Sequence, residues 1–317
     1  MEQRKLIKFG NSSFVISLPS YWIKKNELKK GNNVFFEENS EGNLIITPSI
    51  EEKSDVEKIK INIKSKDSVE QVSRKLVSAY IKGYNVIQIS YSKDFDEKKL
   101  KEIKNIITGL VALEITEQTN ETIKVREFLD INKVSLQDII RRMDIIIKSM
   151  FEKSRSSFSY KNYNELLDRD KEVNKLYHLS FRVIRKAFMN PQIFRSLNVN
   201  HLDLFIIWRI VANMEKIADE IKRTSRYLTE ETIDKKIVDR FLDLYVKVEE
   251  HYNKVMKAHY KNDTMLAYEV ADQNRLLIKE CNELSNSTSN NRSVIKICEK
   301  LKALVSYHKT IARSVYT

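Results

Sequence analysis

Apolar positions in the second half of the chain recur at every third or fourth residue. The clearest stripe consists of Leu136, Ile139, Ile140, Met143, Ile146, Ile147 and Met150. This spacing predicts an amphipathic helix. The same period continues in five further segments, at residues 162–189, 200–228, 232–260, 263–286 and 293–316. Because short loops join these segments, we expect an all-α bundle of six antiparallel helices, built as two three-helix repeats over about 131–228 and 230–317.

The first 50 residues instead alternate apolar and polar positions over short stretches, as strands do. Alternation over 4–9 and 14–18, on either side of the turn-forming residues 10–13, predicts two strands. A short helix is expected after Pro19, and a second hairpin is expected around Gly42. The predicted order is therefore ββαββ. A unit this small should need a second copy to complete its core, so we expect a homodimer.

Residues 55–129 mix strand and helix patterns. Strand-like stretches lie at 59–63, 86–89, 113–115 and 123–125, and helix-like stretches at 69–80 and 100–107. We therefore expect a small α/β middle domain at 55–129, between an N-terminal domain at 1–50 and the helical bundle at 131–317. All five glycines fall in the first 109 residues, and only one proline follows residue 48, which agrees with a helical second half.

Composition narrows the class of protein. The formal net charge is +12, and the first 30 residues hold seven Lys or Arg, which suits an anionic partner. No apolar run is long enough to span a membrane and no secretory signal opens the chain, so we expect a cytoplasmic protein without membrane insertion. No nucleophile, base and acid stand at a recognisable spacing, and the five histidines are scattered, so we do not expect an enzyme.

The N-terminal motif runs from Arg4 to Pro19 as RKLIKFGNSSFVISLP, and LKKGNNV follows at 28–34. A basic strand, a glycine-serine turn, a strand that ends in Leu-Pro, a short helix and Leu-Lys-x-Gly in this order resemble the SpoVT/AbrB swapped-hairpin family, which is found in transition-state regulators and antitoxins. The resemblance implies an interleaved dimeric β-barrel, of which each chain supplies half, that binds duplex DNA. Asn32 stands where that family usually has Asp.

The chemistry of the first hairpin agrees with DNA binding. Cationic side chains neutralise phosphates, and hydroxyls and backbone amides at a turn can position a duplex. The candidate DNA-binding residues are Arg4, Lys5, Lys8, Asn11, Ser12 and Ser13. The alternative is that this domain only dimerises and that its charges are solvated.

Two segments of the helical half, LLDRDKEVNKLY at 166–177 and MEKIADE at 214–220, resemble the acidic helices of PhoU domains. The resemblance implies a divalent or ferric ion of the iron or zinc type, held between these two helices. Side chains at i and i+4 share one helical face and can offer hard oxygen ligands. The candidate ligands are Asp170, Asn174, Glu215 and Asp219, of which Asn174 replaces a usual Asp. The alternative is that these acids form salt bridges with Arg169, Lys171, Lys175 and Lys216.

The second repeat departs further from that pattern. Near residue 272 the only acids are Glu269 and Asp272, and the last helix has no carboxylate near His308. We expect the second ion site to be lost. We also expect His308 to be a lone structural histidine rather than a ligand.

These features together favour a DNA-binding transcription regulator linked to phosphate uptake and homeostasis, with the PhoU-like bundle as sensor or relay. Its expected partners are duplex DNA, a second copy of the chain, and a phosphate transporter or signalling protein. The first alternative is a phosphate-transporter accessory protein whose N-terminal domain only dimerises. The second alternative is an antitoxin-like protein that binds a toxin.

Overall fold

The computed structural model describes residues 3–38, 42–48, 57–156, 163–230, 235–288 and 291–317. The chain divides into two compact units, Met1–Asp55 and Val56–Thr317. In the described ranges, no helix is both long enough and apolar enough to cross a membrane.

The N-terminal unit consists of two short hairpins and one helix. The first hairpin pairs β1 (Ile7–Phe9) with β2 (Ser13–Val15), and the second pairs β3 (Phe35–Glu38) with β4 (Leu44–Thr47). The helix between them is α1 (Ser20–Lys25). The predicted ββαββ order is confirmed, although β1 and β2 are shorter than predicted. In the described residues the two hairpins do not hydrogen-bond to each other as one sheet.

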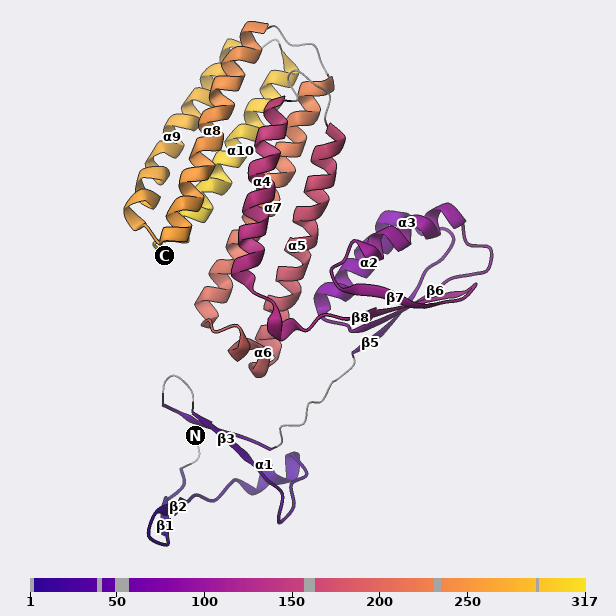
Figure 1. Cartoon of the computed structure of the whole chain (residues 1–317), viewed down its shortest axis with the longest axis vertical. Coiled ribbons are helices and arrows are strands. Elements are labelled where there is room, and N and C mark those ends of the chain that lie inside the picture. Colours follow the sequence, from indigo (N-terminus) through magenta and orange to yellow (C-terminus); the bar gives the residue numbers. More distant parts are fainter. Residues whose placement is uncertain (1–2, 39–41, 49–56, 157–162, 231–234, 289–290) are drawn as a thin grey trace. The chain divides into compact units, whose positions relative to one another are not determined.

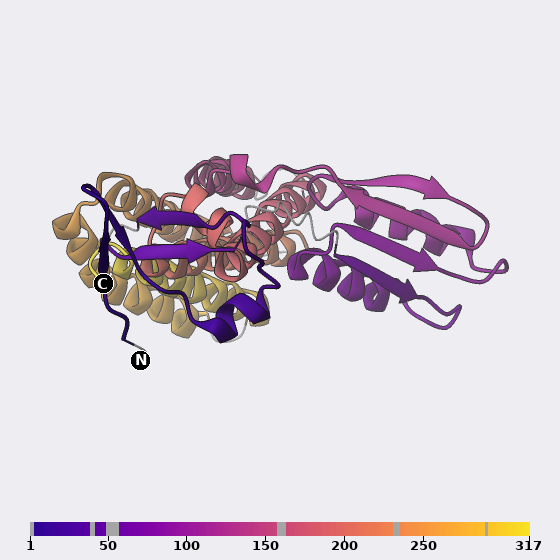
Figure 2. The same ribbon diagram turned by 90° about the horizontal axis from the view of Figure 1, so that it is seen from below.

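The middle part is an α/β domain with a mixed sheet of order β5-β6-β8-β7 (Figure 2). Strands β5 and β6 are parallel, and the other neighbours are antiparallel. The bounds of the four strands are β5 Lys58–Asn62, β6 Val86–Ser90, β7 Leu113–Gln118 and β8 Thr122–Glu127. Helices α2 (Val69–Lys82) and α3 (Glu97–Thr108) cover one face of this sheet (Figures 1 and 2).

Alternation along the strands explains which face carries the helices. The inner face supplies a core that includes Ile61, Ile87, Ile89, Ile123 and Val125. The residues between them on the opposite face are polar, as expected for a sheet with one covered face. Helix α2 begins at a capping box and ends at a glycine with φ of 100°, a backbone conformation that side chains other than glycine rarely adopt.

The helical half contains six long helices among the described residues, in two groups of three (Figure 1). The first group is α4 (Leu136–Ser156), α5 (Tyr163–Met189) and α7 (His201–Glu230). The second group is α8 (Lys235–Lys261), α9 (Thr264–Ser287) and α10 (Arg292–Arg313). Helices α7 and α10, together with α4 and α8, join the two groups. The predicted six-helix bundle is confirmed, and its helix ends lie within a few residues of the predicted ones.

One apolar core runs through all six long helices. The stripe that predicted α4 is mostly buried, with Ile139, Ile140, Met143, Ile147 and Met150 in the core. Two short elements were not predicted: a 3-10 turn at Ile131–Lys133 and helix α6 (Pro191–Ser196). Asn190 caps α6 by accepting from two backbone amides, and Pro191 occupies the first turn, where its missing N–H costs nothing.

Candidate functional site

The predicted DNA-binding residues all belong to the first hairpin and the segment that leads into it. Lys8 lies on β1 opposite Phe14, Ser13 begins β2, and Asn11 and Ser12 form the turn between the strands. Arg4 and Lys5 precede β1. All six residues are exposed, and in the described part of the chain Lys5 and Lys8 have no ion-pair partner. The structure therefore places them together on the surface, and DNA binding by them stays a prediction.

Apolar side chains of the N-terminal unit are exposed as well. None of its described residues is buried. Phe9 is 70% exposed, and the other large exposed side chains of this unit are Leu6, Ile7, Phe14, Val15, Ile16, Tyr21, Phe35, Phe36, Leu44 and Ile45. A soluble domain seldom exposes this many large apolar side chains unless another molecule covers them.

The four predicted ion ligands come together between α5 and α7. Asp170 and Asn174 lie one turn apart on α5, and the Asn174 side-chain amide donates to Asp170 Oδ2 at 3.3 Å. Glu215 and Asp219 lie one turn apart on the facing part of α7, close enough that Asp170 and Asp219 both act on the charge of Glu215. We call Asp170, Glu215 and Asp219 the acidic cluster.

A lysine that was not predicted joins this cluster. Lys222 Nζ lies 2.8 Å from Asp170 Oδ2 and 2.8 Å from Asp219 Oδ1. Arg223 binds the other oxygen of Asp219 at 2.6 Å. The four basic residues proposed as salt-bridge partners were the wrong ones. Within the described residues, Arg169 pairs with Glu172 and Lys171 with Asp168, and neither Lys175 nor Lys216 pairs with the cluster.

The electrostatics of the cluster follow from burial and pairing. Burial lowers the pKa of Lys222, but its hydrogen bonds to Asp170 and Asp219 outweigh that effect and raise the pKa above its usual value. Burial, followed by the charges of Asp219 and Asp170, raises the pKa of Glu215. In the described residues Glu215 has no hydrogen-bond or ion-pair partner of its own.

The arrangement does not fit a metal ion as it stands. A divalent ion bound to both Asp170 and Asp219 would compete with the Lys222 ammonium, which already lies at hydrogen-bond distance from both. Across the described ranges, no group of three or more His, Cys, Asp or Glu side chains is disposed to hold a metal. Metal binding by Asp170, Asn174, Glu215 and Asp219 stays a prediction.

The second three-helix group contains a neutral polar cluster in the corresponding interior. His251 of α8 and His308 of α10 approach through their Nδ1 atoms at 3.1 Å, and His251 Nε2 lies 3.0 Å from the Val270 carbonyl. Asn274 of α9 donates to the Val305 carbonyl at 2.6 Å. His308 is therefore not the lone histidine that the sequence suggested, because the fold pairs it with a residue 57 positions away.

The Val270 carbonyl determines which ring nitrogen of each histidine carries a proton. A carbonyl oxygen only accepts, so His251 Nε2 carries the proton and its Nδ1 accepts from His308 Nδ1–H. His308 Nε2 is then an acceptor with no hydrogen-bond partner among the described residues. Burial lowers the pKa of both rings, and the neighbouring His251 lowers that of His308 further.

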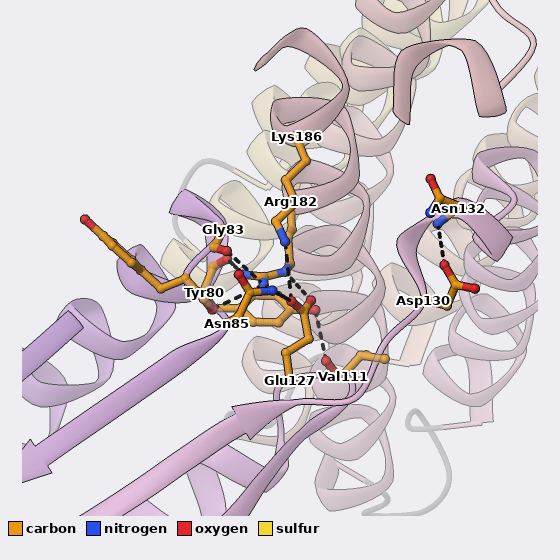
Figure 3. Close-up of polar contacts among 10 residues, drawn as sticks. Tyr80, Gly83, Asn85, Val111, Glu127, Asp130, Asn132, Arg182 and Lys186 are labelled. Atoms are coloured by element: carbon orange, nitrogen blue, oxygen red, sulfur yellow. Dashed lines mark hydrogen bonds and ion pairs between the residues drawn. The ribbon is translucent and has the colours of Figure 1, made fainter. Parts of the chain in front are cut away.

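A buried ionic joint connects α5 to the α/β domain (Figure 3). Arg182 is fully buried and donates through Nε to Glu127 Oε1 at 2.7 Å. Its other nitrogens donate to three backbone carbonyls at the end of α2, those of Tyr80, Gly83 and Tyr84. Asn85 and Lys186 complete the contacts of Glu127, whose side chain is 3% exposed.

Sequence reasoning missed this joint. One signal was available, because Arg182 interrupts the buried apolar stripe of α5 formed by Val173, Leu176, Leu179 and Val183. A charge at a core position of an amphipathic helix must find a partner. The partner lies 55 residues earlier in the sequence, so its identity required the structure.

Comparisons with known proteins agree with both resemblances. The family model "PhoU domain" matches residues 140–228, and the model "Antidote-toxin recognition MazE, bacterial antitoxin" matches residues 7–54. A solved structure of PhoU from Pseudomonas aeruginosa is similar to this chain, with 14% identity and a TM-score of 0.48, over 57% of this chain and 93% of that chain. A search of curated proteins gives no match. Residues 7–54 of this chain are thus similar to MazE-type antitoxins, and residues 140–228, in the helical half, are similar to PhoU domains.

Proposed function

We propose that this chain is a DNA-binding transcription regulator linked to phosphate uptake and homeostasis. In this proposal two N-terminal domains pair to bind duplex DNA, and the PhoU domain receives the signal. The presence of MazE-type and PhoU domains in one chain supports a regulatory role. DNA binding, dimerisation and the phosphate signal are the parts that need experiments.

The exposed apolar surface of the N-terminal unit is the observation that carries the proposal. Two isolated hairpins with side chains such as Phe9 and Phe14 in solvent have no core of their own. A two-stranded hairpin is marginally stable at best, and a domain of about 60 residues buries so little of its surface that its stability is marginal. A second copy of the same unit can cover these side chains, and pairing doubles the cationic groups of the hairpin.

The joint at Arg182 gives the proposed relay a physical path. It lies on α5, the helix that also carries Asp170 and Asn174 of the cluster region. Through Glu127 and the end of α2, it ties that helix to the α/β domain. The α/β domain is the next domain after the N-terminal one in the sequence, so in this proposal α5 would act on the N-terminal domain through the α/β domain.

The test is a DNA pull-down with the intact protein, read out by sequencing, followed by affinity measurements at several salt concentrations. Replacing Arg4, Lys5 and Lys8 together by Ala should weaken binding and reduce the salt slope by about 0.9 for each lost phosphate contact. The matched control removes three exposed lysines from the α/β domain, Lys58, Lys60 and Lys64, with the same change of charge. An equal loss in both variants would contradict the assignment of the hairpin.

The same preparation separates the proposal from its rivals. Sedimentation should show a dimer that Phe9→Asp weakens and that Phe128→Asp, at an exposed phenylalanine of the other unit, leaves intact. A transporter accessory protein whose N-terminal domain only dimerises would show the same dimer with little DNA affinity at moderate salt. An antitoxin-type protein would capture a toxin encoded beside its gene.

A further inference from the structure

The acidic cluster between α5 and α7 contains its own cation. We propose that Lys222 occupies the position of a metal ion in this cluster, so that the PhoU domain of this chain holds its two helices together without a metal. The inference is independent of the proposed DNA binding. It rests on Lys222 Nζ, which lies 2.8 Å from a carboxylate oxygen of each helix.

The contacts of Lys222 reproduce what a bridging cation does. One bond reaches Asp170 on α5 and the other reaches Asp219 on the same helix as Lys222. The ammonium therefore links the two helices through oxygen atoms, as a metal ion between two carboxylates would. Three donor hydrogens let one ammonium serve both acids.

Two cations already pair with two of the three carboxylates of the cluster. Lys222 binds Asp170 and the first oxygen of Asp219, and Arg223 binds the second oxygen of Asp219. Asn174 contributes a neutral amide that donates to Asp170, at a position where a carboxylate would add another negative charge. A divalent ion would enter beside a fixed positive charge, and the repulsion between them opposes its binding.

Burial makes this pairing different from a surface salt bridge. The side chain of Lys222 is 18% exposed and that of Asp170 is 10% exposed. Ion pairs in such surroundings are screened less by water and salt than exposed ones, and removal of one partner leaves a poorly solvated charge. The lysine is therefore a structural counter-ion. Its removal should leave carboxylates that bind another cation.

The experiment compares metal binding by the intact wild-type chain and by variants at position 222. Each protein is treated with EDTA, dialysed, and titrated with Zn²⁺ and separately with Mn²⁺ by calorimetry, and thermal midpoints are recorded with and without each ion. The wild type should contain no stoichiometric metal and keep its midpoint in EDTA and in Zn²⁺. Lys222→Ala should have a lower midpoint that Zn²⁺ or Mn²⁺ raises, with one ion per chain and an affinity at least about tenfold above wild type.

Four further variants make the result decisive. Lys222→Arg keeps the charge and should behave as wild type, whereas Lys222→Gln keeps much of the length without the charge and replaces Lys222→Ala if that variant does not fold. Lys216→Ala removes an exposed lysine of the same helix and should gain no metal. In Lys222→Ala, the additional changes Glu215→Gln and Asp219→Asn should abolish the metal response.

Two results would overturn the proposal. The first is a wild-type chain that binds one Zn²⁺ or Mn²⁺ and loses it on Glu215→Gln with Asp219→Asn. The second is a folded Lys222→Ala or Lys222→Gln protein that gains no affinity for either ion.

Discussion

The two three-helix groups of the bundle place polar groups in their interiors by opposite means. The first group, α4, α5 and α7, pairs opposite charges, with Lys222 between Asp170 and Asp219. The second group, α8, α9 and α10, uses neutral groups, with His251 bonded to His308 and Asn274 bonded to a backbone carbonyl. A common helical layout thus tolerates either solution, provided that the buried groups find partners.

The two three-helix groups also differ in their contacts with the α/β domain. Only the first group carries the ionic joint to the α/β domain, through Arg182 of α5 and Glu127 of β8 (Figure 3). Within the described residues the second group has no such tie to the α/β domain. Among the described residues, the helix group with the charged interior is therefore the one that a buried ion pair ties to the α/β domain.

The largest effect is expected from Arg182→Met. The change leaves Glu127 buried with only Lys186 and Asn85 as partners, and it removes the guanidinium donor from the carbonyls of Tyr80, Gly83 and Tyr84. Breaking a buried pair by removing one partner costs about 3–5 kcal/mol of unfolding free energy. Urea denaturation followed by circular dichroism would measure it.

Two comparisons sharpen that measurement. Arg185→Met, at an exposed position of the same helix, should change the unfolding free energy by no more than about 0.5 kcal/mol. The double change Arg182→Met with Glu127→Gln should cost less than the sum of the single changes, because the buried carboxylate that had lost its arginine is also removed. Strict additivity would mean that the two side chains do not act as a pair.

The second prediction concerns the effect of low pH on the neutral histidine pair of the second helix group. His251 and His308 have folded pKa values below the usual value of about 6.5, so the unfolded chain binds more protons below that pH. Stability contributed by their neutral forms is present above about pH 6.5 and is lost as the pH falls. Each ring approaches a slope of about 1.4 kcal/mol per pH unit only well below pH 6.5, so the unfolding free energy should fall by at most about 2 kcal/mol for the pair between pH 6.5 and pH 5.5.

Unfolding free energies at pH 7.5, 6.5 and 5.5 test this slope. Replacing both His251 and His308 by Gln should flatten it, whereas His201→Gln, at an exposed position of α7, should leave it unchanged. His178 and His259 are also partly buried with lowered pKa values, so the difference between variant and wild type, not the wild-type slope alone, measures the pair. Equal slopes in the double variant and the wild type would refute the assignment.

The periodic parts of this fold could be predicted from the sequence because their signals are long and local. Six helices of more than 20 residues repeat the apolar spacing many times, and the strand pattern of the α/β domain alternates clearly. The strands of the first hairpin were predicted to be longer than they are. None of their side chains is buried within one copy of the unit, so no packing supports longer strands there. The segment that forms helix α6 was predicted to be a break between two helices. Pro191 follows the end of α5 and also begins α6, and the sequence showed only the first of these roles.

The site was predictable only in part. The i, i+4 spacing on α5 and α7 identified the acids that come together. The cation among them was not identified, because Lys222 stands three residues after Asp219 and has the spacing of an ordinary surface pair. The pairs Arg182–Glu127 and His251–His308 join residues more than 50 positions apart, and one sequence carries no signal for such distant contacts.

The smallest effect is expected from Glu215→Gln. This variant tests whether the acidic cluster of the first helix group responds to low pH in the opposite sense from the histidine pair of the second. Burial and the charges of Asp219 and Asp170 raise the folded pKa of Glu215, so at pH 7.5 its ionised form opposes folding. Gln keeps the shape without the charge and should raise the unfolding free energy by about 0.5 kcal/mol, the scale of a like-charge pair one turn apart. As the pH falls through the raised pKa toward about 4.3, the wild-type carboxyl takes up a proton in the folded state and the advantage of the variant disappears. Glu172→Gln on α5 removes an exposed acid paired with Arg169 and should be neutral or slightly destabilising at every pH. If Glu215→Gln is instead destabilising at pH 7.5, the Glu215 carboxylate is bound by a cation in the folded protein, and the charge balance assigned to Lys222 and Arg223 is incomplete.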